Sequence, residues 1–187
     1  SVRHLAHPGW RRAAILGYGE QGREHAKMLR ALNPDAAVVV YGGPRLTGPV
    51  EGCELAPDAR TAVDGADVVV TAGPMSPDPE RRLDPTWLQP RCLVVPVDFS
   101  AYVGADLARR ADDLVTDDLP QFAHYRTLGH FQGWPEPSRS LGEALETEPT
   151  GDLRVSCSLG VGAVDAAVAA VVLERARREG VGVELRR

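Results

Sequence analysis

A strand, a glycine-rich turn and a helix follow one another near the start of the sequence, and this order limits the fold more than any other feature. The segment RAAILGYGEQGREHAKML (12–29) begins with an apolar run, continues through Gly17, Gly19 and Gly22, and opens directly into an amphipathic helical pattern. A G-x-G-x-x-G sequence alone is a weak signal. Between a strand and a helix, however, it is typical of a turn that binds a dinucleotide.

Each glycine of this turn has a separate physical reason. Gly17 allows the tight turn, Gly19 lets the backbone approach a pyrophosphate, and Gly22 lets the helix pack closely on the strand. The helix N-terminus then offers unpaired N–H groups and a positive dipole end to the anion. The alternative is a βα turn that uses its glycines for packing only. Glu20 lies inside the turn, and we expect its carboxylate to point to water.

Apolar runs alternate with helical patterns along the rest of the chain. We expect strands at 12–16, 36–41, 66–72, 91–97, 113–117, 153–159 and 181–185, and helices at 21–32, 58–66, 104–111, 119–128, 140–146 and 161–179. Ser140 and Glu143 form a capping-box pattern, and Gly180 ends the last helix. The alternation predicts a doubly wound parallel sheet, a Rossmann dinucleotide-binding fold, in one domain over residues 1–187.

Composition excludes several classes of protein. A net charge of -5 over 187 residues argues against a nucleic-acid binder. The three cysteines are far apart and odd in number, which fits neither a disulfide framework nor a zinc site, so we expect a reducing cytoplasmic location and buried thiols at Cys92 and Cys157. We expect no membrane span and no metal site, because no apolar run is long enough and the histidine pairs lack a third ligand.

The end of the second expected strand bears on the choice of cofactor. The usual acid that holds the ribose 2′-hydroxyl of NAD is replaced by Gly42, and Arg45 follows shortly after. Arg45 could pair with a 2′-phosphate, so we expect NADP, with NAD still possible. The alternative is that Arg45 is a solvated loop residue. The missing acid also argues against a third possibility, a methyltransferase that uses the same turn for S-adenosylmethionine.

The sequence resembles the cofactor domain of the ornithine cyclodeaminase/mu-crystallin family. The resemblance lies in LAHPGWRRAAILGYGEQGREHAKML, ADVVVTAGPMS, LDPTWLQPRCLVVPVD, SLGEAL and CSLGVGAVDAAVAAVVLERARREGVGVEL, which follow in order along nearly the whole chain. It implies an NAD(P)-dependent oxidoreductase or amino-acid cyclodeaminase, with hydride transfer at the α-carbon of an amino acid or cyclic imine. The cofactor-binding residues that we expect are Gly17, Tyr18, Gly19, Glu20, Gln21, Gly22, Gly42, Arg45, Thr71, Ala72 and Gly73.

The resemblance also implies one catalytic residue and one missing part. Asp98 matches the family's proton-handling Asp after the fourth strand, although Pro96-Val97 precede it and Asp106-Leu107 follow two residues late. The alternative is that Asp98 caps a turn. The family's N-terminal substrate and dimerisation domain has no counterpart here, so we expect this chain alone to be an incomplete catalyst. Its partner would be a second copy in a longer form, or another chain that supplies the substrate half. A rival function is a non-catalytic nucleotide-binding module.

Overall fold

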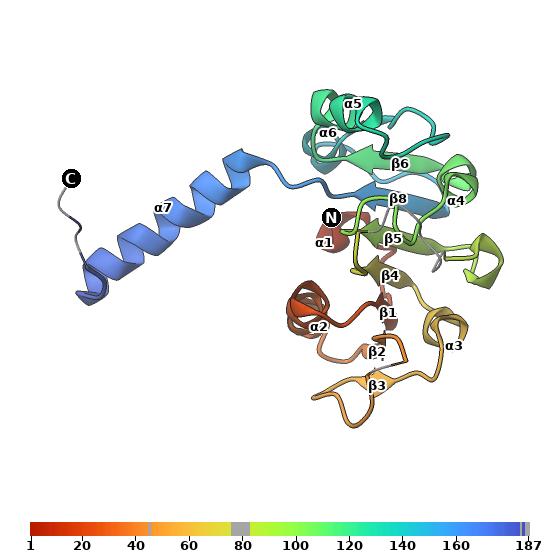
Figure 1. The fold of residues 1–187 in the computed structure, drawn as a ribbon, viewed down its shortest axis with the longest axis horizontal. Helices are drawn as coiled ribbons and strands as arrows, with labels where there is room; N and C mark the ends of the chain where they lie inside the picture. The colour runs from red at the N-terminus through yellow and green to blue at the C-terminus, as the bar shows by residue number, and fades with distance from the viewer. Residues whose placement is uncertain (45, 76–82, 184, 186–187) are drawn as a thin grey trace.

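The computed structural model describes residues 1–44, 46–75, 83–183 and 185 (Figure 1). Their strands form one parallel sheet in the order β3-β2-β1-β4-β5-β8-β6-β7. The bounds of the strands are β1 Arg12–Leu16, β2 Ala37–Tyr41, β3 Glu54–Leu55, β4 Val68–Thr71, β5 Cys92–Pro96, β6 Asp113–Thr116, β7 Arg139–Ser140 and β8 Leu153–Cys157. The direction of winding reverses between β1 and β4, so the fold is the predicted doubly wound Rossmann type.

Helices cover both faces of this sheet (Figure 1). The bounds of the helices are α1 Val2–Leu5, α2 Glu20–Leu32, α3 Ala59–Val63, the 3₁₀ turn η1 Pro85–Trp87, α4 Ala105–Arg110, α5 Leu119–Thr127, α6 Leu141–Leu145 and α7 Gly162–Glu179. One buried cluster joins the sheet to α1, α2 and α6, and the other joins it to α3, α4 and α5. The central strands β4 and β5 are buried along their whole length because both of their faces are covered.

The strands around the reversal end in register. Leu16 pairs with Tyr41 and with Thr71, and Thr71 pairs with Pro96. The carboxyl ends of β2, β1, β4 and β5 therefore meet at one edge. In an open parallel sheet, ligands bind outside this edge, at the point where the winding reverses.

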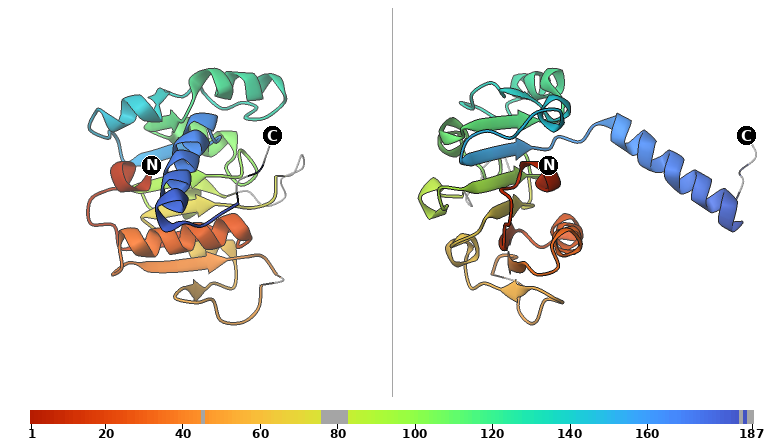
Figure 2. Two further views of the ribbon diagram at one scale, coloured as in Figure 1. Left: turned by 90° about the vertical axis from the view of Figure 1, so that its left-hand side faces the viewer. Right: turned by 180° about the vertical axis from the view of Figure 1, so that it is seen from behind.

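The last helix is the largest departure from the expected packing. Helix α7 projects away from the sheet in Figure 1 and in the right-hand view of Figure 2, and none of its residues is buried. Gly180 ends it in the left-handed conformation, as predicted. The prediction of a strand at 181–185 was wrong for the described residues 181–183 and 185, which form no strand. These residues follow α7 away from the sheet (Figure 1).

Other sequence predictions agree with the structure more closely. The predicted capping box is present, with the Ser140 hydroxyl and the Glu143 carboxylate each bonded to the other residue's backbone. Cys92 and Cys157 are buried, as predicted. Sequence patterns did not predict α1, β3 and β7, which have only two to four residues each. No described helix is long and apolar enough to cross a membrane.

Candidate functional site

The glycine turn lies between β1 and α2 at the carboxyl edge of the sheet. A side chain at Gly17 would meet the Ala72 carbonyl oxygen at 2.3 Å, and one at Gly22 would meet the Gly17 carbonyl oxygen at 2.1 Å. Gly17 also has φ of 99°, a conformation that favours glycine. These two glycines are therefore required by packing, whether or not a ligand binds.

Gly19 is different, because no packing contact requires it. A Cβ built on Gly19 has no heavy atom within 4 Å, and its φ of -75° suits any residue. Gly19 is the N-cap of α2, and no side chain caps this helix. The first-turn N–H groups of Glu20, Gln21 and Gly22 have no acceptor among the described residues. The turn thus combines open space with unpaired donors, which is the geometry of an anion site.

The other described residues expected at the cofactor lie in or beside this turn. Glu20 and Gln21 are exposed, whereas Tyr18 and Gly42 are half-buried at the ends of β1 and β2. A side chain at Gly42 would meet Leu46 at 2.4 Å and Tyr18 at 3.0 Å, so close packing is one reason for this glycine. Arg45, the residue expected to select NADP, lies outside the described residues.

The end of β4 and the two residues after it lie beside the glycine turn. Thr71 is fully buried, and Ala72 continues the pairing with β1 through a 2.7 Å bond from its N–H to the Leu16 carbonyl. Gly73 packs against Tyr102, which a Cβ at Gly73 would approach to 1.9 Å. The structure therefore brings Ala72 and Gly73, which follow β4, next to Gly17.

Asp98 lies two residues beyond β5 and is tied to this β4 segment. Its Oδ1 accepts a 2.6 Å hydrogen bond from the Thr71 hydroxyl, and its Oδ2 accepts a 2.9 Å bond from the Gly73 N–H. The side chain is 2% exposed. Burial raises the pKa of Asp98 to about 6, against the opposing effect of the two hydrogen bonds. A carboxyl that titrates near neutrality suits proton transfer, but both of its oxygens already have partners.

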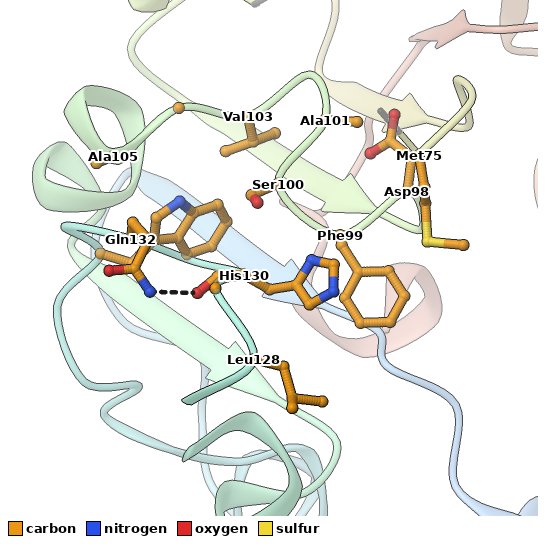
Figure 3. A pocket seen from close by; sticks show the side chains of 13 residues that line it. Met75, Asp98, Phe99, Ser100, Ala101, Val103, Ala105, Leu128, His130 and Gln132 are labelled. Carbon is orange, nitrogen blue, oxygen red and sulfur yellow. Dashed lines mark hydrogen bonds between the residues drawn. The ribbon is translucent and has the colours of Figure 1, made fainter. Parts of the chain in front are cut away.

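Asp98 also lines a cavity of about 480 Å³. Figure 3 shows it between the loop after β5 and the loop after α5. The sequence patterns did not predict this cavity, because its lining residues come from loops that are far apart in the sequence. The described lining residues are Met75, Asp98, Phe99, Ser100, Ala101, Val103, Gly104, Ala105, Leu128, Gly129, His130, Gln132 and Trp134.

Two other kinds of chemistry find no support in the described part of the chain. No group of three or more His, Cys, Asp or Glu residues is placed to hold a metal there. Cys157, in the CSLG segment, is 1% exposed, and burial raises the pKa of its thiol. A buried neutral thiol is a poor nucleophile, so Cys157 is a core residue.

The comparisons with known proteins begin with sequence relatives. No family model matches the chain. It is 28% identical to the nodulation efficiency protein NfeD of Rhizobium meliloti over 96% of its own length, and it spans 60% of that relative.

Several solved structures have a similar fold. The structure of CmnK has a TM-score of 0.79 at 24% identity, over 100% of this chain and 60% of that one. The iminosuccinate reductase of Paracoccus denitrificans, solved with NAD⁺, has a TM-score of 0.78 at 19% identity, over 100% and 63%. The probable ornithine cyclodeaminase of Bordetella pertussis Tohama I has 0.75 at 21% identity, over 98% and 65%. The resemblance found in the sequence is thus confirmed in the fold, which this chain shares with ornithine cyclodeaminase-type proteins.

Proposed function

We propose that this chain binds NADP or NAD along the carboxyl edge of the sheet and forms the cofactor half of an oxidoreductase. The substrate would be an amino acid or a cyclic imine, and the reaction would be of the ornithine cyclodeaminase/mu-crystallin type. The observation that carries the proposal is the open space at Gly19, because no contact within the protein requires a glycine there. Support also comes from the similar structure solved with NAD⁺.

The residues present fit a dinucleotide at this site. The pyrophosphate would lie over Gly19, where the N–H groups at the start of α2 and the dipole of a 13-residue helix face it. The ribose of the adenosine would lie beyond β2 near Gly42, and the nicotinamide would extend toward the β4 segment at Thr71–Gly73. Gly17 and Gly22 hold the shape of the turn through their contacts with neighbouring backbone.

The protein's contribution to the chemistry is orientation and a proton. The nicotinamide, when bound, supplies or accepts the hydride at the substrate α-carbon. Asp98 lies between the β4 segment and the cavity, and its pKa of about 6 places proton exchange within the physiological range. For that role the Thr71 hydroxyl and the Gly73 N–H would stabilise the ionised form of Asp98 after the proton leaves.

A non-catalytic nucleotide-binding module is the second candidate. The observation in its favour is that Asp98 is 2% exposed and already accepts two hydrogen bonds. A carboxylate in that state can act purely as a link between β4 and β5. No Lys or Arg is found among the described cavity-lining residues to hold a substrate carboxylate. The substrate clamp would then come from another part of the protein or from a partner.

The two candidates separate in a pair of measurements on the purified chain. Calorimetry with NADPH and NADH tests binding, which both candidates require. Hydride exchange with imines such as pyrroline carboxylate tests catalysis, and a version extended upstream serves as the comparison. Binding with exchange only in the extended version supports the oxidoreductase. Binding without exchange in either version supports the module, and no binding contradicts both.

A further inference from the structure

The cavity beside Asp98 has several large apolar side chains in its walls. Its described lining combines apolar side chains from Met75, Phe99, Val103, Leu128 and Trp134 with the polar side chains of Asp98, Ser100, His130 and Gln132. Its volume of about 480 Å³ compares with about 150 Å³ for an engineered apolar cavity that holds benzene. The space is therefore large enough for a whole aromatic or branched aliphatic side chain with room to spare.

The aromatic wall is built as a fixed cluster. The centroid of the Phe99 ring lies 4.9 Å from that of the Tyr125 ring, edge to face, and 5.2 Å from that of the His130 ring. It also lies 5.6 Å from the ring of Phe131, which stacks on Phe122 at 4.6 Å. Figure 3 shows the rings of Phe99 and His130 side by side at the cavity. Such an arrangement presents ring surface to a ligand without first having to order it.

Two residues of this cluster have strained backbones. Phe99 has φ of 57° and Phe131 has φ of 53°, and these are the described residues other than glycine with positive φ. Bulky residues rarely adopt this conformation, and residues that do so cluster at ligand sites. The strain at Phe99 turns the chain immediately after Asp98, so the same backbone feature positions both the carboxylate and the ring.

The second loop of the cavity is held from outside. Arg109 donates a 2.6 Å hydrogen bond to the Gly133 carbonyl, and Arg126 donates one of 3.1 Å to the Trp134 carbonyl. Gln132 donates to the carbonyl of His130, the contact marked in Figure 3. Both arginines therefore act on the back of the loop, and neither lines the cavity.

The charge of the cavity limits what can enter it. Among its described lining residues there is no Lys or Arg, and Asp98 is the one carboxylate. An acidic side chain would approach the Asp98 carboxylate, and none of the described lining residues carries a permanent positive charge that would compensate. A cationic side chain would lose its hydration, while Asp98 is buried and already engaged by Thr71 and Gly73. An uncharged side chain incurs neither cost.

We infer that this cavity binds the bulky, uncharged side chain of the substrate, aromatic or branched aliphatic, with the substrate's α-carbon toward Asp98. The inference rests on the proposed function and names the substrate class of that site. It separates this chain from the similar iminosuccinate reductase, whose named substrate has a carboxylate in its side chain. The α-carboxylate would be bound outside the cavity.

The test uses three amides that share the same head and differ in the charge of the tail. The probes are 3-phenylpropanamide, which is neutral and aromatic, glutaramate, which is anionic, and 5-aminopentanamide, which is cationic. The readout is the indole N–H resonance of each tryptophan in ¹⁵N-labelled chain, assigned with Trp→Phe variants. Trp134 lines the cavity, whereas Trp10 and Trp87 do not and serve as internal controls. We expect 3-phenylpropanamide to shift Trp134 alone and the charged probes to bind at least about tenfold more weakly.

A matched pair of variants locates the binding. Leu128 lines the cavity at the end of α5 and is 60% exposed, and Leu145 at the end of α6 is 54% exposed and lies elsewhere. Leu128→Ala should weaken 3-phenylpropanamide by about fivefold through lost apolar contact, and Leu145→Ala should leave it unchanged. Both side chains are exposed, so neither change should prevent folding.

Each outcome separates this inference from the proposed function. NADPH and NADH binding is measured by calorimetry on the same sample. If a dinucleotide binds but 3-phenylpropanamide leaves Trp134 unmoved, or if glutaramate binds as tightly, the substrate class is wrong and the proposed function stands. If the amide binds and no dinucleotide does, the proposed function is wrong, and the assignment of this cavity to a substrate is wrong with it.

Discussion

The turn after β1 and the loop after β5 lie at the same edge of the sheet, but their polar groups are in opposite states. In the turn, Gly19 faces open space and the N–H groups at the start of α2 have no described acceptor. In the loop, both oxygens of Asp98 are already bonded, to Thr71 and to Gly73. The turn is thus prepared for a ligand that brings its own acceptors. The loop is internally satisfied, so under the proposed function its carboxyl would need a second component before it could react.

This difference also separates structural from functional roles within one motif. Like Asp98, Gly17 and Gly22 have a structural reason within the protein, because a side chain at either glycine would collide with neighbouring backbone. Gly19 resembles a binding residue, because its lack of a side chain serves nothing in the protein itself. Substitutions in the two regions should therefore affect stability and binding in different proportions.

The largest effect on stability should come from Gly17→Ala. The new methyl group would lie 2.3 Å from the Ala72 carbonyl oxygen at a φ of 99°, so both overpacking and backbone strain apply. We expect a loss of about 4 kcal/mol in the free energy of unfolding, measured by urea denaturation. Gly19→Ser is the control and should change stability by less than about 0.5 kcal/mol, because serine also caps helices well. Equal losses in the two variants would remove the distinction between these glycines.

Asp98→Asn should change how stability depends on pH. The pKa of Asp98 in the folded chain is raised from 3.8 to about 6, so the folded state holds this proton more tightly than the unfolded state. The stability that this group contributes is complete below pH 3.8 and is lost as pH rises to about 6, by about 3 kcal/mol at 1.4 kcal/mol per pKa unit. Asparagine does not titrate. The variant should therefore gain about 3 kcal/mol relative to the parent between pH 4 and pH 7.

Denaturation curves at a series of pH values measure this difference, and other carboxylates cancel because both proteins contain them. Parallel pH profiles for the two proteins would show that Asp98 titrates normally and is not the buried group described above.

Thr71→Val should have a smaller effect in the same region. It removes the 2.6 Å hydrogen bond to Asp98 and keeps the side-chain shape, so we expect a loss of about 2 kcal/mol at pH 7. The pKa of Asp98 should rise further, because the Thr71 hydroxyl favours the ionised form. Thr116→Val is the matched control, since the hydroxyl of this buried residue lies 3.4 Å from Asp117 and bonds it weakly. Unfolding at pH 7 and at pH 4 compares the two variants. A loss at Thr71 no larger than that at Thr116 would contradict the link between β4 and β5.

The smallest effect should be on cofactor choice. Gly42 replaces the usual acid and Arg45 follows it in the sequence, so we expect NADPH to bind more tightly than NADH. Arg45→Ala should weaken NADPH by about 1 kcal/mol and leave NADH nearly unchanged, as calorimetry can show. Tighter NADH binding by the parent would reverse this preference.

The sequence predicts the glycine turn and the sheet well because both depend on local patterns. A buried run followed by glycines and a helix leaves few alternatives, and β1, β4 and β5 lie where apolar runs indicate. The short strand β7 lacks such a pattern. Its residue Arg139 is held by a 2.6 Å ion pair with Asp113, a long-range contact that periodicity does not show.

The cavity could not be predicted for a related reason. Phe99 and Leu128 are far apart in the sequence, and they line one space only because the loops after β5 and α5 meet. The positive φ at Phe99 and Phe131 has no sequence signal, since these are not residues that favour it. The direction of α7 also depends on contacts outside its own sequence. Asp117 accepts hydrogen bonds from the N–H groups of Leu159 and Gly160 just before this helix.

We propose that a dinucleotide pyrophosphate lies in the open space at Gly19, and a calorimetric comparison of two valine variants can decide whether it does. Gly19→Val places a branched side chain in that space, and Gly162→Val places the same side chain at the start of α7, where a Cβ also meets nothing within 4 Å. We expect the parent and Gly162→Val to bind NADPH equally, and folded Gly19→Val to bind both NADPH and NADH at least about tenfold more weakly, or about 1.4 kcal/mol. Unchanged binding of both cofactors by folded Gly19→Val would show that the glycine turn is not the site.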